Sequence, residues 1–198
     1  MAGKDALSPE LIRIMKIFGT VSVALVLLLS FFNDRKADNT GSRDEYSITD
    51  ASRIYFKNLR QSYYDLERRQ DAKMDLFRYG KRVTDTTQYI LNAALIINRV
   101  KDAAYLYLEP QGGLEKENPL EIRWEKSSGE KDGSSFYQGD RYSHFQFVVE
   151  IYPLLEIEEE VTFEAKLRDE WIPILTSAQE IDALRITFKD YYRLISRE

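Results

Sequence analysis

His144, the only histidine of the chain, stands next to Ser143 and is the first candidate for base-activated nucleophilic chemistry. In such a site the base must reach the nucleophile and must itself be oriented by a third group. Neighbouring residues point their side chains apart on a helix or a strand, and the sequence identifies no third group. We therefore expect His144 to be a core or partly exposed histidine without a catalytic role.

Five glutamates between positions 156 and 164 are the candidate for a divalent cation site, because carboxylate oxygens suit such ions. They are Glu156, Glu158, Glu159, Glu160 and Glu164. The run lacks the Asp, Asn and Gly pattern that folds a chain around calcium, so its simplest interpretation is a solvated acidic surface. Glu159 shares the alternating phase of Val161 and Phe163 and is expected to point inward unless a turn or bulge intervenes.

Other signatures of catalysis and cofactor binding are missing from the sequence. The chain has no cysteine, which excludes disulfides, thiolate zinc sites, iron-sulfur clusters and cysteine nucleophiles. Gly80 and Lys81 lack the rest of a phosphate-binding loop, and there is no G-x-G-x-x-G, H-E-x-x-H or G-x-S-x-G motif. We expect a non-enzymatic protein with no catalytic residue, no metal, no cofactor and no small-molecule substrate.

The strongest local signal is a run of sixteen uncharged residues, Ile17 to Phe32, which Asp34 and Lys36 follow closely. As a helix this run alone spans about 24 Å, which is short of the ~30 Å hydrocarbon core of a bilayer. The apolar residues from Leu11 onward extend it, provided that the two intervening basic side chains reach toward the headgroups. We expect a transmembrane anchor over 11–32, contacting lipid through Ile17, Val21, Val23, Leu25, Leu27, Leu28, Leu29, Phe31 and Phe32.

Two alternatives to an anchor are a cleaved signal peptide and a buried globular helix. The apolar run ends in Ser30-Phe31-Phe32 and lacks the small residues of a cleavage site. A helix apolar on all faces beside a polar segment also has no neighbouring element to cover it. The predicted plan is a polar tail over 1–10, the anchor over 11–32, a polar tether over 33–46 and one soluble domain over 47–198.

The location of the domain is inferred from the flanks of the anchor. The basic residues on its two sides are nearly balanced, but a short leader before a long domain favours signal-anchor insertion with the N-terminus in the cytoplasm. No Asn-x-Ser/Thr acceptor for glycosylation occurs. We expect a single-pass protein of the bacterial inner membrane with its C-terminal domain in the periplasm.

For the soluble part we predict an α+β fold with a mostly antiparallel sheet packed against two to four helices. Alternating apolar residues indicate strands over 104–109, 120–125 and 161–167. Glycine-rich stretches over 110–113 and 126–139 are expected to be surface loops. Ser177 and Glu180 form a capping-box pattern, which predicts a C-terminal helix over 178–196 whose apolar stripe packs on the sheet.

The remaining segments are less clearly marked. A helix capped by Asp140 and ending near Pro153 is favoured over a strand, and Tyr89 to Val100 has helical spacing. Residues 47–66 fit a helix opened by Ser47, or alternatively a long hairpin with 76–79, and the sequence leaves both open.

Residues 53–82 form a basic block with nine basic and four acidic residues in a chain whose net charge is −5. The patch it predicts consists of Arg53, Lys57, Arg60, Arg68, Arg69, Arg78, Lys81 and Arg82. It could contact anionic lipid headgroups or a partner, and it could equally complement acidic groups of its own domain. Nucleic acid is excluded as a partner, because the domain is acidic and has no recognition motif.

Location and the missing catalytic motifs together give the functional hypothesis. We expect an anchored accessory subunit that contacts lipid through 11–32 and docks on partner proteins of an envelope complex. The thirteen tyrosines suit such interfaces. The alternative is a tethered ligand-binding or sensor domain with a pocket lined by Tyr105, Tyr107 and Trp124, and a membrane-bound hydrolase using Glu159 or His144 ranks lowest.

Overall fold

The computed structural model describes residues 8–31, 46–85, 87–157 and 160–196, and the chain divides into two compact units, Met1–Ala37 and Asp38–Glu198. The first contains helix α1, Pro9–Phe31, which begins after Ser8, whose hydroxyl accepts a hydrogen bond from the Leu11 amide. This confirms the helix prediction up to Phe31, whereas Phe32 and the expected tether up to position 45 lie outside the described residues.

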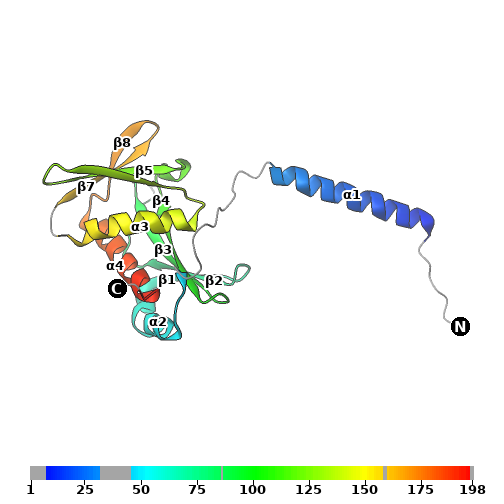
Figure 1. Ribbon diagram of the computed structural model, residues 1–198, viewed down its shortest axis with the longest axis horizontal. Helices are drawn as coiled ribbons and strands as arrows, with labels where there is room; N and C mark the ends of the chain where they lie inside the picture. The colour runs from blue at the N-terminus through cyan, green and yellow to red at the C-terminus, as the bar shows by residue number, and fades with distance from the viewer. Residues whose placement is uncertain (1–7, 32–45, 86, 158–159, 197–198) are drawn as a thin grey trace. The chain divides into compact units, whose positions relative to one another are not determined.

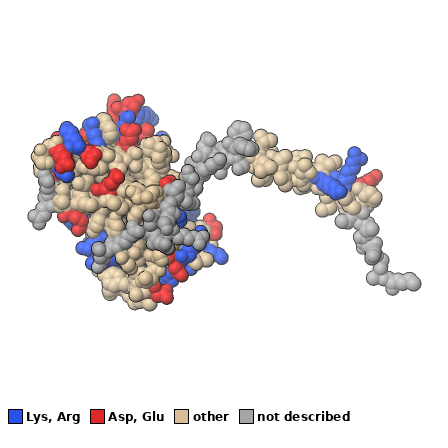
Figure 2. Space-filling model, viewed as in Figure 1, with Lys and Arg blue, Asp and Glu red and all other residues tan. Residues whose placement is uncertain are grey.

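Helix α1 is long and apolar enough to cross a membrane, and no residue of its most apolar window is buried. Its 23 residues correspond to about 34 Å, which matches the ~30 Å hydrocarbon core. Charged side chains gather at its N-terminal end, and the rest of its surface is uncharged (Figure 2). Apolar side chains such as Ile17 and Leu29 have exposed fractions of 57% and 61%.

The second unit contains two four-stranded antiparallel sheets, which confirms the α+β class (Figure 1). Sheet A is a meander in the order β1-β2-β3-β4, and sheet B has the order β6-β5-β7-β8. The strands of sheet A are β1 Tyr64–Arg69, β2 Met74–Tyr79, β3 Leu91–Asn98 and β4 Ala103–Pro110. Those of sheet B are β5 Leu120–Lys126, β6 Lys131–Phe136, β7 Val161–Leu167 and β8 Glu170–Ile174. The three expected strands appear as β4, β5 and β7.

Two long helices and several short helical turns complete the second unit. The helices are α2 Asp50–Tyr55, α3 Arg141–Glu156 and α4 Ala178–Leu194, with a π-helical turn η2 Phe56–Arg60 and 3-10 turns η3 Gln61–Tyr63 and η4 Leu114–Lys116. Helix α4 packs on β3 and β4, whereas α3 contacts β4 of sheet A and β6 of sheet B (Figure 1). Helix α3 therefore joins the two sheets, and the buried side chains form one continuous core.

Helix α4 follows its sequence signals closely. The Ser177 hydroxyl accepts from the Glu180 amide, and the Glu180 carboxylate accepts from the Ser177 amide, so the capping box is formed. Leu184, Phe188 and Tyr191 lie on the buried side of the helix and are at most 1% exposed. The predicted apolar stripe is thus the surface that covers sheet A.

The helix expected over Tyr89 to Val100 is wrong, because this segment forms strand β3, Leu91–Asn98. Strand β3 lies between β2 and β4, and seven of its eight residues are buried. A strand buried on both faces is apolar at nearly every position, so the two-residue alternation that marks a half-buried strand is absent. A short apolar run of this kind fits helical spacing equally well.

Two further expectations were wrong in part. The stretch 126–139 contains the edge strand β6, which is mostly exposed and pairs only with β5, so its glycine and serines need not be buried. Helix α3 continues three residues beyond Pro153. Proline removes a hydrogen bond to the carbonyl of Val149, but both residues lie on the exposed side, where water can solvate that carbonyl.

Residues 47–66 combine the two alternatives that the sequence left open. Thr49, and not Ser47 as expected, caps α2 through the Ser52 amide, while Ser47 forms a β-bridge with Ala103. Helical turns continue to Tyr63, and β1 then forms a hairpin with β2. Tyr46, the last residue of the expected tether, is 1% exposed and belongs to the core. The packed part of the domain therefore includes position 46.

Candidate functional site: a cationic cleft beside an exposed apolar surface

The eight residues of the predicted basic patch do not form one surface. Arg68 and Arg69 are adjacent on β1, so their side chains leave sheet A on opposite faces. Arg69, Arg78 and Arg82 form ion pairs with acidic residues of β1 and β4. Arg53, Lys57 and Arg68 line a cleft on the other side, and Arg60 is held in a buried network.

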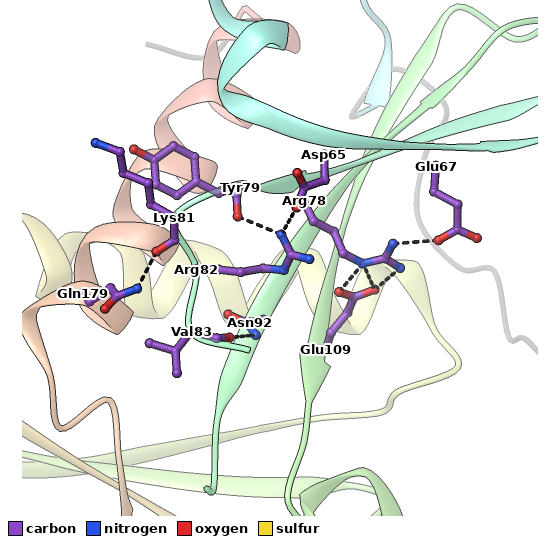
Figure 3. Close-up of polar contacts among 10 residues, drawn as sticks. All are labelled: Asp65, Glu67, Arg78, Tyr79, Lys81, Arg82, Val83, Asn92, Glu109 and Gln179. Atoms are coloured by element: carbon purple, nitrogen blue, oxygen red, sulfur yellow. Dashed lines mark hydrogen bonds and ion pairs between the residues drawn. The ribbon is translucent and has the colours of Figure 1, made fainter. Parts of the chain in front are cut away.

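On one face of sheet A, Arg78 is fully engaged by two carboxylates (Figure 3). Its Nη2 donates to Oε1 of Glu109 at 2.6 Å and its Nη1 donates to Oε2 of Glu67 at 2.7 Å. The register partner of Arg78 on β3 is Ala94, whose small side chain leaves room for the guanidinium to reach β4. Bonding to Glu109 raises the pKa of Arg78, and bonding to Arg78 lowers the pKa of Glu67.

Two neighbouring basic residues are held on the same side of the domain (Figure 3). Arg82 donates to Oδ2 of Asp65 at 2.6 Å and to the carbonyl of Tyr79 at 2.9 Å. The backbone carbonyl of Lys81 accepts from the Gln179 side chain at 2.9 Å. Arg78 and Arg82 thus pair with acidic groups of their own domain. This is the interpretation in which the basic block complements acidic residues of the same domain.

Arg60 is occupied by a buried carboxylate of α4. Its Nε lies 2.9 Å from both carboxylate oxygens of Asp190, which is 2% exposed. The hydroxyl of Tyr64 donates to Oδ2 of Asp190 at 2.6 Å. Burial, and then the charge of Asp190, raises the pKa of Tyr64, so the phenol stays protonated and acts as a donor. This network fixes the end of the π-helical turn η2 against α4.

The remaining members of the patch border a cleft of about 240 Å³ between the segment 53–61 and sheet A. We refer to it as the cationic cleft. Its apolar floor consists of Phe56, Leu66, Phe77 and Ile97, and its polar rim consists of Arg53, Lys57, Gln61, Arg68, Asp75 and Arg99. The rim therefore has four basic residues and one acidic residue.

The register of sheet A explains how these residues meet. Arg68 pairs with Asp75, and Asp75 pairs with Ile97, so the three form one row across three strands. Leu66 and Phe77 form the next row on the same face, and the ring of Phe56 packs edge-on against Phe77 with a centroid distance of 5.1 Å. The helical segment 53–61 and sheet A thus place basic side chains around an apolar floor.

The rim has an excess of positive charge. Arg53 pairs with Asp102, and Nε of Arg99 lies 3.6 Å from Oδ1 of Asp75. Within the described ranges, Lys57 and Arg68 form no ion pair with any other side chain. Asp75 Oδ1 and Arg53 Nε are buried without a hydrogen-bond partner in that same part of the chain. The cleft is therefore electropositive and contains unsatisfied polar atoms.

Arg99 is a member of this site that sequence reasoning missed. It follows β3 in the turn to β4, far from the basic block along the chain. A helix over 89–100, as predicted, would not pair with β2, and this pairing is what brings Arg99 beside Asp75. A prediction of strand β3 paired with β2 would have placed Arg99 at the cleft.

An exposed apolar surface adjoins the cleft on the outside of α2 and the turns that follow it. This outer apolar surface consists of Ile54, Tyr55, Leu59 and Tyr63, which are between 39% and 58% exposed. The guanidinium of Arg60 lies 4.8 Å from the ring centroid of Tyr63, and that of Arg193 lies 5.9 Å from that of Tyr55. Tyr55, Leu59 and Tyr63 follow at four-residue spacing along consecutive helical turns, which places them near one another on one side, and exposed apolar residues in this arrangement mark interaction surfaces.

His144 lies in the core and has a structural role. It is 1% exposed, its Nδ1 accepts from the Leu108 amide, and its Nε2 lies 3.1 Å from the Gln138 carbonyl. Burial lowers its pKa to about 4, so the ring is neutral at pH 7. Its Nδ1 bond joins α3 to the edge of β4, and Ser143 is turned away, with its hydroxyl accepting from the Tyr137 amide.

The other sequence candidates that the structure describes are not assembled into a site. Trp124 lies on β5 of sheet B, and a second cleft of about 460 Å³ is lined by Tyr105 but not by Tyr107 or Trp124. Glu158 and Glu159 lie outside the described residues, and Glu164 pairs with Arg123 at 2.6 Å. No three His, Asp or Glu residues are grouped to hold a metal in the parts of the chain that the structure describes.

Comparison with known proteins gives no further guide to function. No protein-family model, no curated protein and no solved structure matches this chain.

Proposed function

We propose that the protein is a non-enzymatic, single-pass accessory subunit whose soluble domain docks on partner proteins of a membrane complex. The observation that carries this proposal is helix α1, an apolar helix of membrane-spanning length without buried residues, in the same chain as a separate compact domain. Anchoring keeps a domain at high local concentration near its partners, so that a modest interface is enough for binding.

The proposed docking surface is the outer apolar surface, which holds four of the nine large apolar side chains that are exposed in the described part of the domain. Tyr55 and Tyr63 provide rigid amphipathic contact area, and Ile54 and Leu59 provide apolar area, which together resemble the centre of a protein interface. The occupant is a partner protein with a matching apolar patch. Arg193, whose guanidinium lies beside the ring of Tyr55, places a basic residue at the margin of this surface and favours a partner with an acidic rim.

The proposed location is the bacterial inner membrane, with the domain in the periplasm. Support comes from the order of the elements, in which the apolar helix α1 precedes every helix and strand of the domain that the structure describes. Because the chain has no cysteine, Lys131→Cys on the exposed strand β6 provides a unique label. A membrane-impermeant maleimide should label it in cells with a permeabilised outer membrane, and labelling only after lysis would place the domain in the cytoplasm.

Partner docking is tested by site-specific crosslinking in cells. A photoreactive group on Leu59→Cys, at the centre of the outer apolar surface, should give a discrete heteromeric adduct. The same group on Lys131→Cys is the matched control and should not give it. A second substitution, Tyr55→Ser, should reduce the adduct while leaving the protein in the membrane. Equal adducts from both cysteines, or none from Leu59→Cys, would refute docking through this surface.

A further inference from the structure

We propose that the cationic cleft is a binding site for a phosphate ester, with the phosphate held by Lys57, Arg68 and Arg99 and the adjoining carbon atoms on the apolar floor. The phosphate is either the headgroup of an anionic lipid or that of a small soluble ester. This site is independent of partner docking, because it is formed by the inner side of 53–61 and by sheet A rather than by the outer apolar surface.

The charge of the rim favours an anion with more than one negative charge. Asp75 offsets one of the four basic residues, and Asp102 engages Arg53 from outside the cleft. Lys57 and Arg68 are left with no carboxylate partner among the described side chains, and Arg99 is only loosely paired, at 3.6 Å. Arginine presents a planar fork that matches phosphate oxygens, and lysine adds a point charge.

The buried polar atoms point to the same conclusion. Among the described residues, Nε of Arg53 is a buried donor without a hydrogen-bond partner, and Oδ1 of Asp75 is a buried acceptor that also lacks one. Leaving such atoms unpaired is costly, and a ligand that brings oxygens and hydroxyl groups can satisfy them. In glycerol phosphate the free glycerol hydroxyls can donate to the Asp75 carboxylate, and the phosphate oxygens can accept from the Arg53 guanidinium.

The floor and the size of the cleft limit what the ligand carries. Phe56, Leu66 and Phe77 form an apolar base that gains nothing from a fully hydrated ion, so a short carbon body is favoured. At about 240 Å³ the cleft is smaller than the pockets of roughly 300–1,000 Å³ that enclose drug-sized ligands. It therefore suits a headgroup whose remainder stays outside.

The test uses the full chain in nanodiscs made of neutral lipid, titrated with glycerol 3-phosphate at low salt and followed by calorimetry. The double variant Arg68→Gln with Arg99→Gln should raise Kd about tenfold or more, because it removes two charge-assisted contacts. The matched control is Arg69→Gln, which removes the same kind of charge from the opposite face of β1 and should leave Kd nearly unchanged. If the double variant does not fold, Lys57→Gln, whose side chain is exposed, serves in its place.

A second arm distinguishes the source of the phosphate. In nanodiscs containing phosphatidylglycerol, hydrogen exchange of the backbone over 53–69 should slow relative to neutral discs if the ligand is a lipid, and this protection should be lost in the Arg68 variant but not in the Arg69 variant. Binding of glycerol 3-phosphate without lipid protection assigns a soluble ester. The proposal is overturned if neither probe binds, or if Arg69→Gln weakens binding as much as the cleft variants.

Discussion

Acidification should weaken the domain through His144, and the structure sets the size of the effect. Burial holds the ring neutral and lowers its pKa from 6.5 to about 4 on folding, against the bond to the Gln138 carbonyl and the charge of Asp140, which both raise the pKa. The unfolded chain takes up the proton as the pH falls below 6.5, whereas the folded domain does so only near pH 4. Stability is therefore complete above about pH 6.5 and is lost progressively between there and pH 4, by about 3 kcal/mol.

The assay is urea unfolding of the full chain in detergent, followed by the fluorescence of the two tryptophans, Trp124 and Trp171, both of which lie in the folded domain. The reference is His144→Gln, which cannot titrate in this range but keeps one donor and one acceptor. Carboxylates titrate in both proteins, so the difference in slope isolates the imidazole. We expect the wild-type free energy of unfolding to fall by about 1.2 kcal/mol per pH unit more steeply than that of the variant near pH 5. Parallel pH profiles would refute the assignment.

Two further predictions concern the packing of the domain. Asp190→Ala should lower the free energy of unfolding by roughly 3 kcal/mol, because it leaves Arg60 without its buried partner. Denaturant unfolding measures this loss, and a change within experimental error would contradict the prediction. Gly112→Ala should destabilise by about 3 kcal/mol, since φ is +78° and a Cβ would lie 2.3 Å from the Gln88 carbonyl oxygen. Gly129→Ala is the control, because its φ is +84° but no atom lies within 4 Å of the added Cβ. It should lower the free energy of unfolding by only about 1 kcal/mol. Equal losses in the two variants would refute the steric argument.

The elements that could be predicted from sequence are those whose signals are local. The capping box of Ser177 and Glu180 and the stripe behind it specify α4 without reference to the rest of the fold. Strands β5 and β7 alternate because one face is buried and the other wet. Strand β3 could not be separated from a helix, because both of its faces are buried in the folded domain and that burial is a tertiary property.

The candidate site illustrates the same limit. The sequence identified a basic block but could not divide it, because the two faces of a strand carry adjacent residues such as Arg68 and Arg69 to different surroundings. The partner of Arg60 is 130 positions away on α4, and Arg99 joins the cleft only through strand pairing. Pairing between distant segments decided which charges are neutralised and which line the cleft.

The central claim is that α1 is a retained, lipid-solvated anchor for a domain that lies in water. Its most direct test is alkaline carbonate extraction of membranes from cells that produce the protein, combined with intact-mass measurement of the extracted chain. We predict that the chain stays in the membrane pellet and retains its N-terminal segment. Recovery in the soluble fraction, or a mass that lacks the residues up to the end of α1, would contradict the account.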